Sequence, residues 1–473
     1  MVAIVYATYL VLARLYGPEL MGTFLIAVNM VTFLGTICTL GLNNGMLRYS
    51  ALLKENGQIG LVSRLVYKNA LVIMGLTLLT AGVIYYYRFW LAEYLNAPDL
   101  PKVLLCFAVA LPILALTFLL RETLRGLGAV LLATLTAYVA QPAMLLGLIL
   151  AFYYMVPWLP DLATALSGAF LLSFTGALVI LLWGLKKYTP RPQPGLEISL
   201  PWKEIWGYSL IVFFSVALQT GLAMLDSLIL ALFRTPQEVA YYGAAMKMAV
   251  FVSLPLIAIN AILPPLFVQH HQRGEVRELE YVARSTARWM YYLALPTCLL
   301  FLLVPVELLD FFGPGFSKAK WALGVLALGQ LASVSAGSVF LLLTLTKNQK
   351  TALKVYVSGF SIILPLMALM AAKYGLTGLA LSKAFGLALL NGLGAWQVWK
   401  TLGVLSFPSE IIQLTLLSLG AFGLIWILHY NYSPPLIWTL LSFVIQYLII
   451  FSLIARRCGD WQLLKAIPRR ARG

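Results

Sequence analysis

The chain has 473 residues, of which 61% are hydrophobic and only 11% charged, and its mean hydropathy is +0.90. An average soluble domain carries about 25% charged residues. This composition therefore excludes a soluble enzyme, a disordered protein and a soluble nucleic-acid-binding domain, and it indicates an all-α polytopic membrane protein. The formal charge of +16 then reports on the membrane side where lysine and arginine accumulate, and no nucleic-acid partner is expected.

Apolar runs that approach the length of a bilayer-crossing helix, about 20 residues, are predicted at fourteen places in chain order. They are 1–16, 20–45, 66–87, 103–120, 129–153, 162–185, 205–232, 240–262, 289–307, 321–345, 355–372, 376–398, 411–429 and 436–454. The first run is short for a full crossing, so we expect the start of that helix to be missing. The segment Tyr153–Asp161, with two prolines, and Lys373-Tyr374-Gly375 mark the two weakest breaks between helices.

The basic residues predict the orientation of these helices. With a cytoplasmic N-terminus, 24 of the 33 lysines and arginines fall in inner loops and the C-terminal tail, seven at the outer side, and two inside spans. This asymmetry predicts a multi-pass protein of the plasma (inner) membrane with both termini in the cytoplasm. It also accounts for the net positive charge.

No cofactor, metal or catalytic centre is expected from the sequence. Cys38, Cys106, Cys298 and Cys458 are scattered, which favours neither a disulfide framework nor a zinc site. The pair His270-His271 lies in a charged loop, where a solvated position is favoured over a metal site. No loop is long enough for a catalytic domain and no phosphate-binding loop motif occurs, so the chain is predicted not to be an enzyme.

An internal repeat predicts the domain organisation. Pro18-Glu19-Leu20-Met21 matches Pro236-Gln237-Glu238-Val239 at an offset of 218, and Tyr138-Val139 matches Tyr356-Val357 at the same offset. An offset of six helices leaves both halves in the same orientation. We therefore predict an N-terminal six-helix bundle at 1–185, a cytoplasmic linker at 186–203, a C-terminal six-helix bundle at 204–400, and two further helices with a basic tail at 401–473.

Polar residues inside the predicted spans are candidates for a substrate path, because a polar group in lipid is costly. In the span 20–45, Asn29, Thr32, Thr36, Thr39 and Asn43 recur at helical spacing and predict one continuous face. That face either lines a hydrated cavity or packs against a neighbouring helix. A similar face of Gln330, Ser333, Gly337 and Thr344 in 321–345 favours packing.

Three charged residues lie inside spans: Asp226, Lys247 and Lys383. Asp226 and Lys247 are ten and eleven residues from Pro236, at the turn between their helices, so at about 1.5 Å per residue they reach a similar depth. They either form a structural ion pair, or Lys247 binds an anionic substrate group alone or together with Lys383. Asp226 is then a candidate for ion coupling.

Basic residues near the predicted inner mouth have two interpretations. They either anchor the protein at the cytoplasmic surface or gather phosphate head groups. These residues are Arg48, Lys68, Arg121, Arg125, Arg284, Arg288 and Lys354.

The segment Ala13–Gly22 reads A-R-L-Y-G-P-E-L-M-G and resembles the signature of Wzx-type polysaccharide flippases, a group within the MOP exporter superfamily. Asp226, the apolar run after it and Pro236–Tyr242 are similar to a second stretch of that family, although Ala240 replaces its usual glycine. The resemblance implies two bundles in a V that move undecaprenyl-diphosphate-linked oligosaccharide from the inner to the outer leaflet by alternating access. Leu20 stands where the lipid II flippases carry a second arginine, which argues against the peptidoglycan precursor.

The predicted binding residues for the diphosphate and sugar are Arg14, Asn29, Asn43, Arg48, Lys247 and Lys383. The predicted partners are a polyprenyl-diphosphate-linked glycan, the lipid bilayer and other polysaccharide assembly proteins. Two alternatives remain. One is a MATE-like cation-coupled exporter of small organic molecules, which two lysines against one acid disfavour. The other is a membrane polysaccharide polymerase or ligase, which the short outer loops disfavour.

Overall fold

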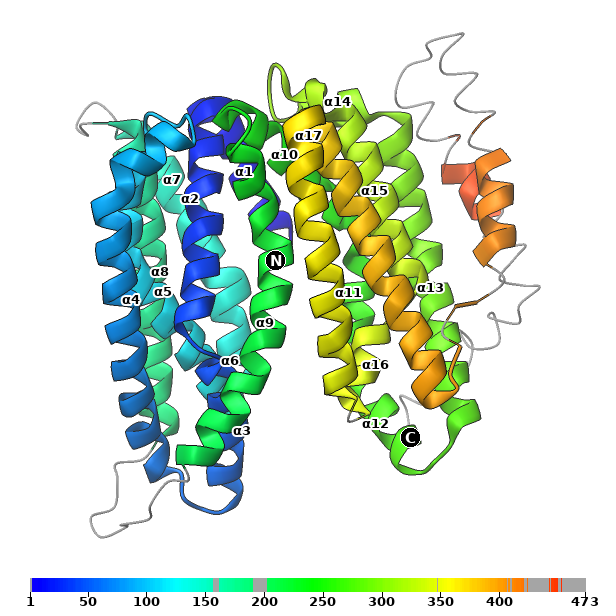
Figure 1. Ribbon diagram of the computed structural model, residues 1–473, viewed down its shortest axis with the longest axis horizontal. Coiled ribbons are helices and arrows are strands. Elements are labelled where there is room, and N and C mark those ends of the chain that lie inside the picture. The colour runs from blue at the N-terminus through cyan, green and yellow to red at the C-terminus, as the bar shows by residue number, and fades with distance from the viewer. Residues whose placement is uncertain are drawn as a thin grey trace. The chain divides into compact units, whose positions relative to one another are not determined.

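The computed structural model describes residues 2–155, 161–189, 202–346, 348–405, 407–408, 411–420, 423, 442, 444–449 and 452. Within these residues the chain forms helices and no strand (Figure 1), which confirms the predicted all-α class. In chain order the helices are α1 Val2–Val11, α2 Gly17–Cys38, α3 Leu42–Glu55, α4 Gly60–Tyr94, α5 Leu100–Gly126, α6 Val130–Leu135, α7 Gln141–Tyr154, α8 Leu162–Tyr188, α9 Trp202–Ala231, α10 Pro236–Ala249, α11 Leu254–Asn260, α12 Pro264–Gln272, α13 Val276–Leu303, α14 Pro305–Asp310, α15 Lys320–Ser335, α16 Val339–Leu345 and α17 Gln349–Leu402.

Ten segments of the described chain are long and apolar enough to cross a membrane, so the protein is a multi-pass membrane protein. Two of them hold two predicted spans each. Ala3–Cys38 turns at Gly17 (φ 81°, ψ 166°), and the 54-residue α17 is interrupted at Gly375 (φ 59°, ψ −141°). The first twelve predicted spans therefore all have a helical counterpart. Of the last two, Ile411–Gly420 is helical, and most of 436–454 lies outside the described residues.

Two predicted spans contain a break at residues with positive φ, which divides each of them into two helices. The run 20–45 divides into α2 and α3 at Leu40 and Gly41, which have φ of 46° and 73°. The run 321–345 divides into α15 and α16 at Gly337, with φ of 72°. Residues with positive φ cannot continue a right-handed helix. The polar faces predicted to run continuously along these two spans are therefore interrupted.

The chain packs into two compact units. Unit 1 comprises Met1–Ala245, Leu309–Ala319 and Tyr356–Ser382, and unit 2 comprises Met246–Leu308, Lys320–Val355 and Lys383–Gly473. The division into bundles predicted from the repeat stays a prediction. Residues 190–201 of the predicted linker and 453–473 of the predicted tail lie outside the described residues.

The middle of unit 1 is built around three phenylalanines from three different helices. Phe107 of α5 and Phe170 of α8 stack with ring centroids 4.3 Å apart, and Phe24 of α2 meets Phe107 edge-on at 5.8 Å. All three are buried. Such aromatic pairs contribute beyond the area they bury, so this cluster fixes α2, α5 and α8 against one another.

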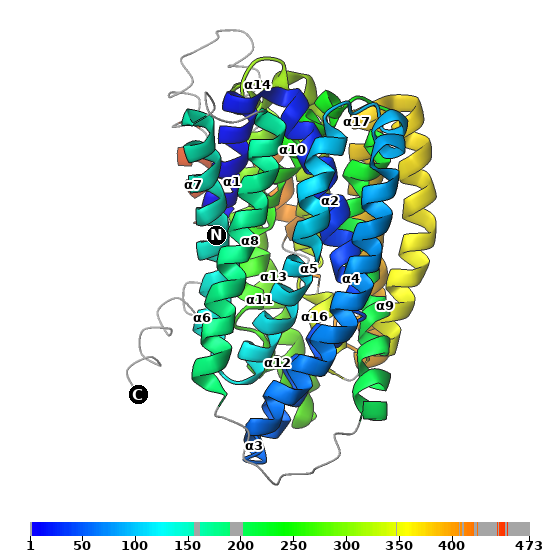
Figure 2. The ribbon, with the colours of Figure 1, turned by 90° about the vertical axis from the view of Figure 1, so that its left-hand side faces the viewer.

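One end of unit 1 is formed by the short helix α3 together with the ends of longer helices. Figure 2 shows α3 and the start of α4 at the same end as the start of α9. A second apolar cluster lies here, with Leu42 and Met46 of α3, Leu65 of α4 and Leu119 of α5 fully buried. This packing fixes the position of α3 against the C-terminal end of α5 and the N-terminal end of α9.

Unit 2 is held by close contacts between α13, α15 and α17. Asn391 of α17 donates a hydrogen bond to Ser333 Oγ of α15 at 3.1 Å, and Gly337 approaches Ala287 of α13. Tyr291 of α13 and Thr415 share a hydrogen bond of 2.6 Å. The polar residue Ser333, predicted to favour packing, therefore does serve a helix contact.

Candidate functional site

A pocket of about 430 Å³ lies at the α3 end of unit 1. Its lining comes from three helices: Asn44, Leu47, Arg48, Ala51, Leu52 and Glu55 of α3, Arg125 and Gly126 of α5, and Tyr208 of α9. Two arginines, an amide and one acid, Glu55, thus share one cavity, in which the basic groups outnumber the acidic one. This combination is typical of sites that bind a ligand with an anionic group.

Glycines bring the three helices close enough to form the pocket. A Cβ on Gly41, the residue before α3, or on Gly45 of α3 would overlap Ser209 of α9, and a Cβ on Gly126 of α5 would overlap the carbonyl of Leu47. Small residues allow such close helix approach because they have little or no side chain. In a membrane this close packing holds helices together, since apolar side chains already in lipid gain nothing by burial. The Gly41 turn also supplies the change of direction from α2 into α3.

Arg48 is held in the pocket by aromatic rings. Its guanidinium carbon lies 4.6 Å from the ring centroid of Tyr208 and 5.8 Å from that of Tyr49. Within the described part of the chain, no carboxylate lies within ion-pair distance of Arg48. Stacking on an aromatic ring uses the face of the guanidinium and leaves its N–H groups for an oxyanion.

Tyr49 stays a neutral neighbour of Arg48. Burial raises the pKa of the Tyr49 phenol, and Glu204 and Tyr208 add to that rise, while Arg48 acts against it. The rings of Tyr49 and Tyr208 meet nearly at right angles with centroids 6.5 Å apart. The two rings therefore form an aromatic support for the arginine.

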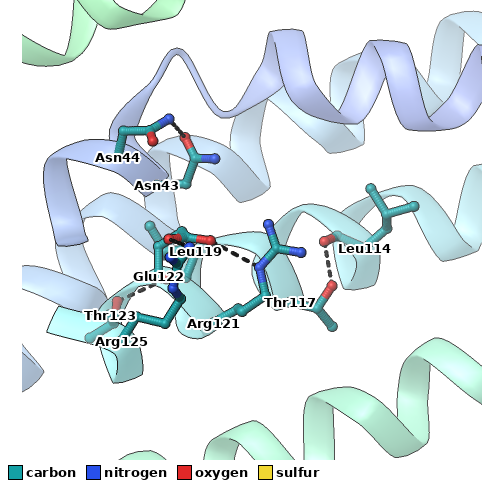
Figure 3. A network of polar contacts seen from close by, with 9 residues as sticks. All are labelled: Asn43, Asn44, Leu114, Thr117, Leu119, Arg121, Glu122, Thr123 and Arg125. Carbon is teal, nitrogen blue, oxygen red and sulfur yellow. Dashed lines mark hydrogen bonds and ion pairs between the residues drawn. The ribbon is translucent and has the colours of Figure 1, made fainter. Parts of the chain in front are cut away.

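Beside the pocket, Glu122 of α5 is buried between two arginines of the same helix (Figure 3). Arg121 Nε donates to Glu122 Oε1 at 3.0 Å, and Arg125 Nη1 donates to Oε2 at 2.8 Å. Glu122 is 6% exposed at its side chain, whereas Arg125 is 45% exposed. A buried carboxylate needs such partners to offset its lost hydration.

Two adjacent asparagines add amide groups near this cluster. Asn44 Nδ2 donates to Asn43 Oδ1 at 3.4 Å, as Figure 3 shows, and Asn43 is buried while Asn44 lines the pocket. Amides both donate and accept hydrogen bonds, which suits sugar hydroxyls. Asn43 and Arg48, both predicted as binding residues, are thus brought to the same end of unit 1 on α3.

Arg14 and Asn29 do not join this cluster. Arg14 lies before α2, and its Nε donates to the carbonyl of Phe311 at 2.6 Å. The 22-residue α2 separates Arg14 from the α3 end by about 33 Å at 1.5 Å per residue. Asn29 is half-buried within α2, on a different helix from Asn43.

Asp226 is buried in α9 and hydrogen-bonded within unit 1. Its Oδ2 accepts from the Tyr242 hydroxyl at 3.1 Å, and its Oδ1 accepts from the Ser227 N–H at 2.8 Å. Lys247 is half-buried and Lys383 buried, and both belong to unit 2. The proposed pair between Asp226 and Lys247 stays a prediction, as do the binding roles of the two lysines.

Sequence reasoning missed Glu122 and Tyr208. The run Arg121-Glu122-Thr123-Leu124-Arg125 places an acid between two arginines at the end of an apolar span, and that charge pattern was a usable signal. Tyr208 carried no signal, because its pairing with Arg48 joins residues far apart in sequence.

Comparison with known proteins gives matches of two kinds. Residues 1–272 match the sequence profile of the family described as polysaccharide biosynthesis protein, and residues 212–369 match the MatE profile. No curated protein sequence matches the chain.

The fold is also found among solved structures. The lipid II flippase MurJ in an inward closed conformation superposes with a TM-score of 0.75 at 14% identity, covering 97% of both chains. A multidrug resistance MATE family transporter of the MOP superfamily, in an inward-facing conformation, gives 0.72 at 12% identity and covers 85% of this chain and 95% of its own. The Vibrio cholerae MATE transporter VcmN gives 0.54 at 17% identity, with 84% and 94% covered.

Proposed function

Because the chain belongs to the polysaccharide biosynthesis protein family, we propose that it moves undecaprenyl-diphosphate-linked oligosaccharide from the inner to the outer leaflet of the plasma membrane. The observation that carries this proposal is the pocket in which Arg48 and Arg125 lie beside Asn44. Both termini are then cytoplasmic, and the pocket opens toward the side where such lipids are assembled. Its partners are this lipid-linked glycan, the bilayer and other polysaccharide assembly proteins.

The chemistry of the proposed substrate fits the pocket. A diphosphate and its sugars cannot enter hydrocarbon without partners for their charges and hydroxyls. Arginine matches phosphate oxygens in a two-pronged geometry, and Asn44 offers an amide to sugar hydroxyls. The protein's role in this proposal is to bind and reorient the head group, with no covalent chemistry.

Transport in vesicles tests the proposal. Purified protein is reconstituted in liposomes with undecaprenyl diphosphate carrying one fluorescent sugar, and the outer-leaflet fraction is quenched over time. We expect transfer by the wild type, a large loss in Arg48→Ala, and wild-type transfer in the matched control Arg64→Ala. Arg64 is an exposed arginine of α4 that does not line the pocket. No transfer by the wild type, or equal transfer by both variants, contradicts the proposal.

A second candidate function is cation-coupled export of small organic molecules. The MatE profile match over residues 212–369 includes Asp226, a buried acid of the kind that binds cations. Uptake of the dye ethidium into inverted vesicles under an imposed proton or sodium gradient tests it. Dye transport that is lost in Asp226→Asn, without lipid transfer by the wild type, would establish this function instead of the first.

A further inference from the structure

We propose that Glu122 is an internal counter-anion that holds Arg125 while the pocket is empty and gives it up when a diphosphate enters. This inference rests on the proposed function, because it assigns a substrate-dependent role to a residue beside the same pocket. The part of the substrate concerned is the second phosphate of a diphosphate, which competes with the Glu122 carboxylate for Arg125.

The geometry connects Glu122 to the pocket through one shared arginine. Arg125 bonds Glu122 Oε2 at 2.8 Å and also lines the cavity. The guanidinium is 45% exposed at its side chain while the carboxylate is 6% exposed. An incoming anion can therefore reach Arg125 directly but reaches Glu122 only past it.

Arg121 makes the exchange energetically feasible. It bonds the other carboxylate oxygen, Oε1, at 3.0 Å and does not line the pocket. A buried carboxylate left with no partner is strongly unfavourable. With Arg121 in place, Glu122 keeps one charged partner after Arg125 turns toward the ligand, so Arg125 can be released.

The two pocket arginines then respond to different ligands. Within the described chain Arg48 forms no ion pair, although Glu55 also lines the pocket, so a single phosphate binds there without disturbing Glu122. A diphosphate has a second anionic group that reaches Arg125 and displaces Glu122. When the ligand leaves, Glu122 regains Arg125, which favours release of a head group that must not stay bound.

Binding to full-length protein in nanodiscs tests this role, with farnesyl diphosphate and farnesyl monophosphate as probes. Glu122→Gln keeps the side-chain shape and removes the competing charge. We expect it to tighten farnesyl diphosphate binding roughly five- to tenfold, which corresponds to release of one part-exposed ion pair. Farnesyl monophosphate binding is expected to change less than twofold.

A second variant moves the affinity in the opposite direction. Arg121→Gln removes one of the two ion-pair partners that Glu122 has in the described chain and leaves Arg125, so Glu122 holds Arg125 more strongly. We expect farnesyl diphosphate to bind several-fold more weakly, although residue 121 does not line the pocket. If Glu122→Gln does not fold, the affinity of Arg121→Gln for farnesyl diphosphate tests the proposal by itself.

The outcomes separate the two proposals. If the wild type binds neither probe, the proposed function fails at this pocket. If the wild type binds farnesyl diphosphate and Arg48→Ala loses it, but Glu122→Gln weakens binding or leaves it unchanged, the counter-anion role is wrong while the proposed function stands. A purely structural role of Glu122 predicts weaker binding of both probes in both variants.

Discussion

Gly22 of α2 lies against Pro236, the first residue of α10, so closely that a Cβ on Gly22 would overlap the Pro236 carbonyl. Three residues further along α2, Leu25 packs on Gly243 of α10. Leu25 and Gly243 are themselves related by the repeat offset of 218. The two helices that open with the repeated proline motif therefore meet through small residues inside unit 1.

Replacing Gly22 with alanine is expected to destabilise the protein by about 1 to 3 kcal/mol, because the backbone of α10 has to move away. Gly75 in the middle of α4 is the matched control, since a Cβ there meets nothing within 4 Å. Gly75→Ala is expected to be neutral or stabilising by up to about 1 kcal/mol. Thermal unfolding of both variants in the same detergent measures the difference, and equal shifts contradict the close contact.

Tyr208→Leu is expected to weaken farnesyl diphosphate binding about two- to fivefold, because Arg48 loses its stacking partner. Tyr208→Phe keeps the ring and is expected to bind as the wild type does. Titration of both variants in nanodiscs checks this expectation. Wild-type affinity in Tyr208→Leu would show that the ring does not position Arg48 for the ligand.

Arg14→Ala is expected to loosen the segment 309–319, because Arg14 binds the carbonyl of Phe311 there. The segment keeps its ring contacts, Tyr6 with Phe312 and Tyr241 with Phe316, with centroids 5.3 and 5.0 Å apart. Faster hydrogen exchange confined to 309–319 is the expected readout. Arg88→Ala serves as control, since Arg88 bonds a carbonyl of its own helix. Unchanged exchange together with lost substrate transfer instead supports a direct binding role for Arg14.

Tyr242→Phe removes a hydrogen-bond donor from the buried Asp226 and is expected to cost about 1 to 3 kcal/mol of stability. Tyr138→Phe is the control, because Tyr138 is 42% exposed. A double-mutant cycle of Tyr242→Phe with Asp226→Asn, followed by thermal unfolding, isolates the pairwise contribution. Strict additivity of the two changes contradicts the bond.

The sequence predicted the helices well because hydrocarbon demands long apolar runs. It did not reveal the breaks at Gly41 and Gly337, since a glycine inside such a run looks the same whether its φ is negative or positive. Gly375 was recognised because a charged and an aromatic residue precede it. The lesson is that the length of a run predicts a crossing but not its continuity.

The site is predictable only where a charged or polar residue stands out against an apolar background. Arg48 stands out by its charge and Asn43 by the helical spacing of polar residues, and both lie at the α3 end of unit 1. Glu122 was overlooked as one acid among basic anchors, and its role depends on burial that the sequence does not show. The contact between Arg48 and Tyr208 depends on how α3 and α9 pack, which no local pattern encodes.

The chain passes between the two units several times, at residues 245–246, 308–309, 319–320, 355–356 and 382–383. The first of these junctions lies within α10 and the last two within α17, so these helices belong to both units at once. Lys247 and Lys383 lie within two residues of two of these junctions, so each of these intramembrane charges stands where a continuous helix passes from one unit into the other.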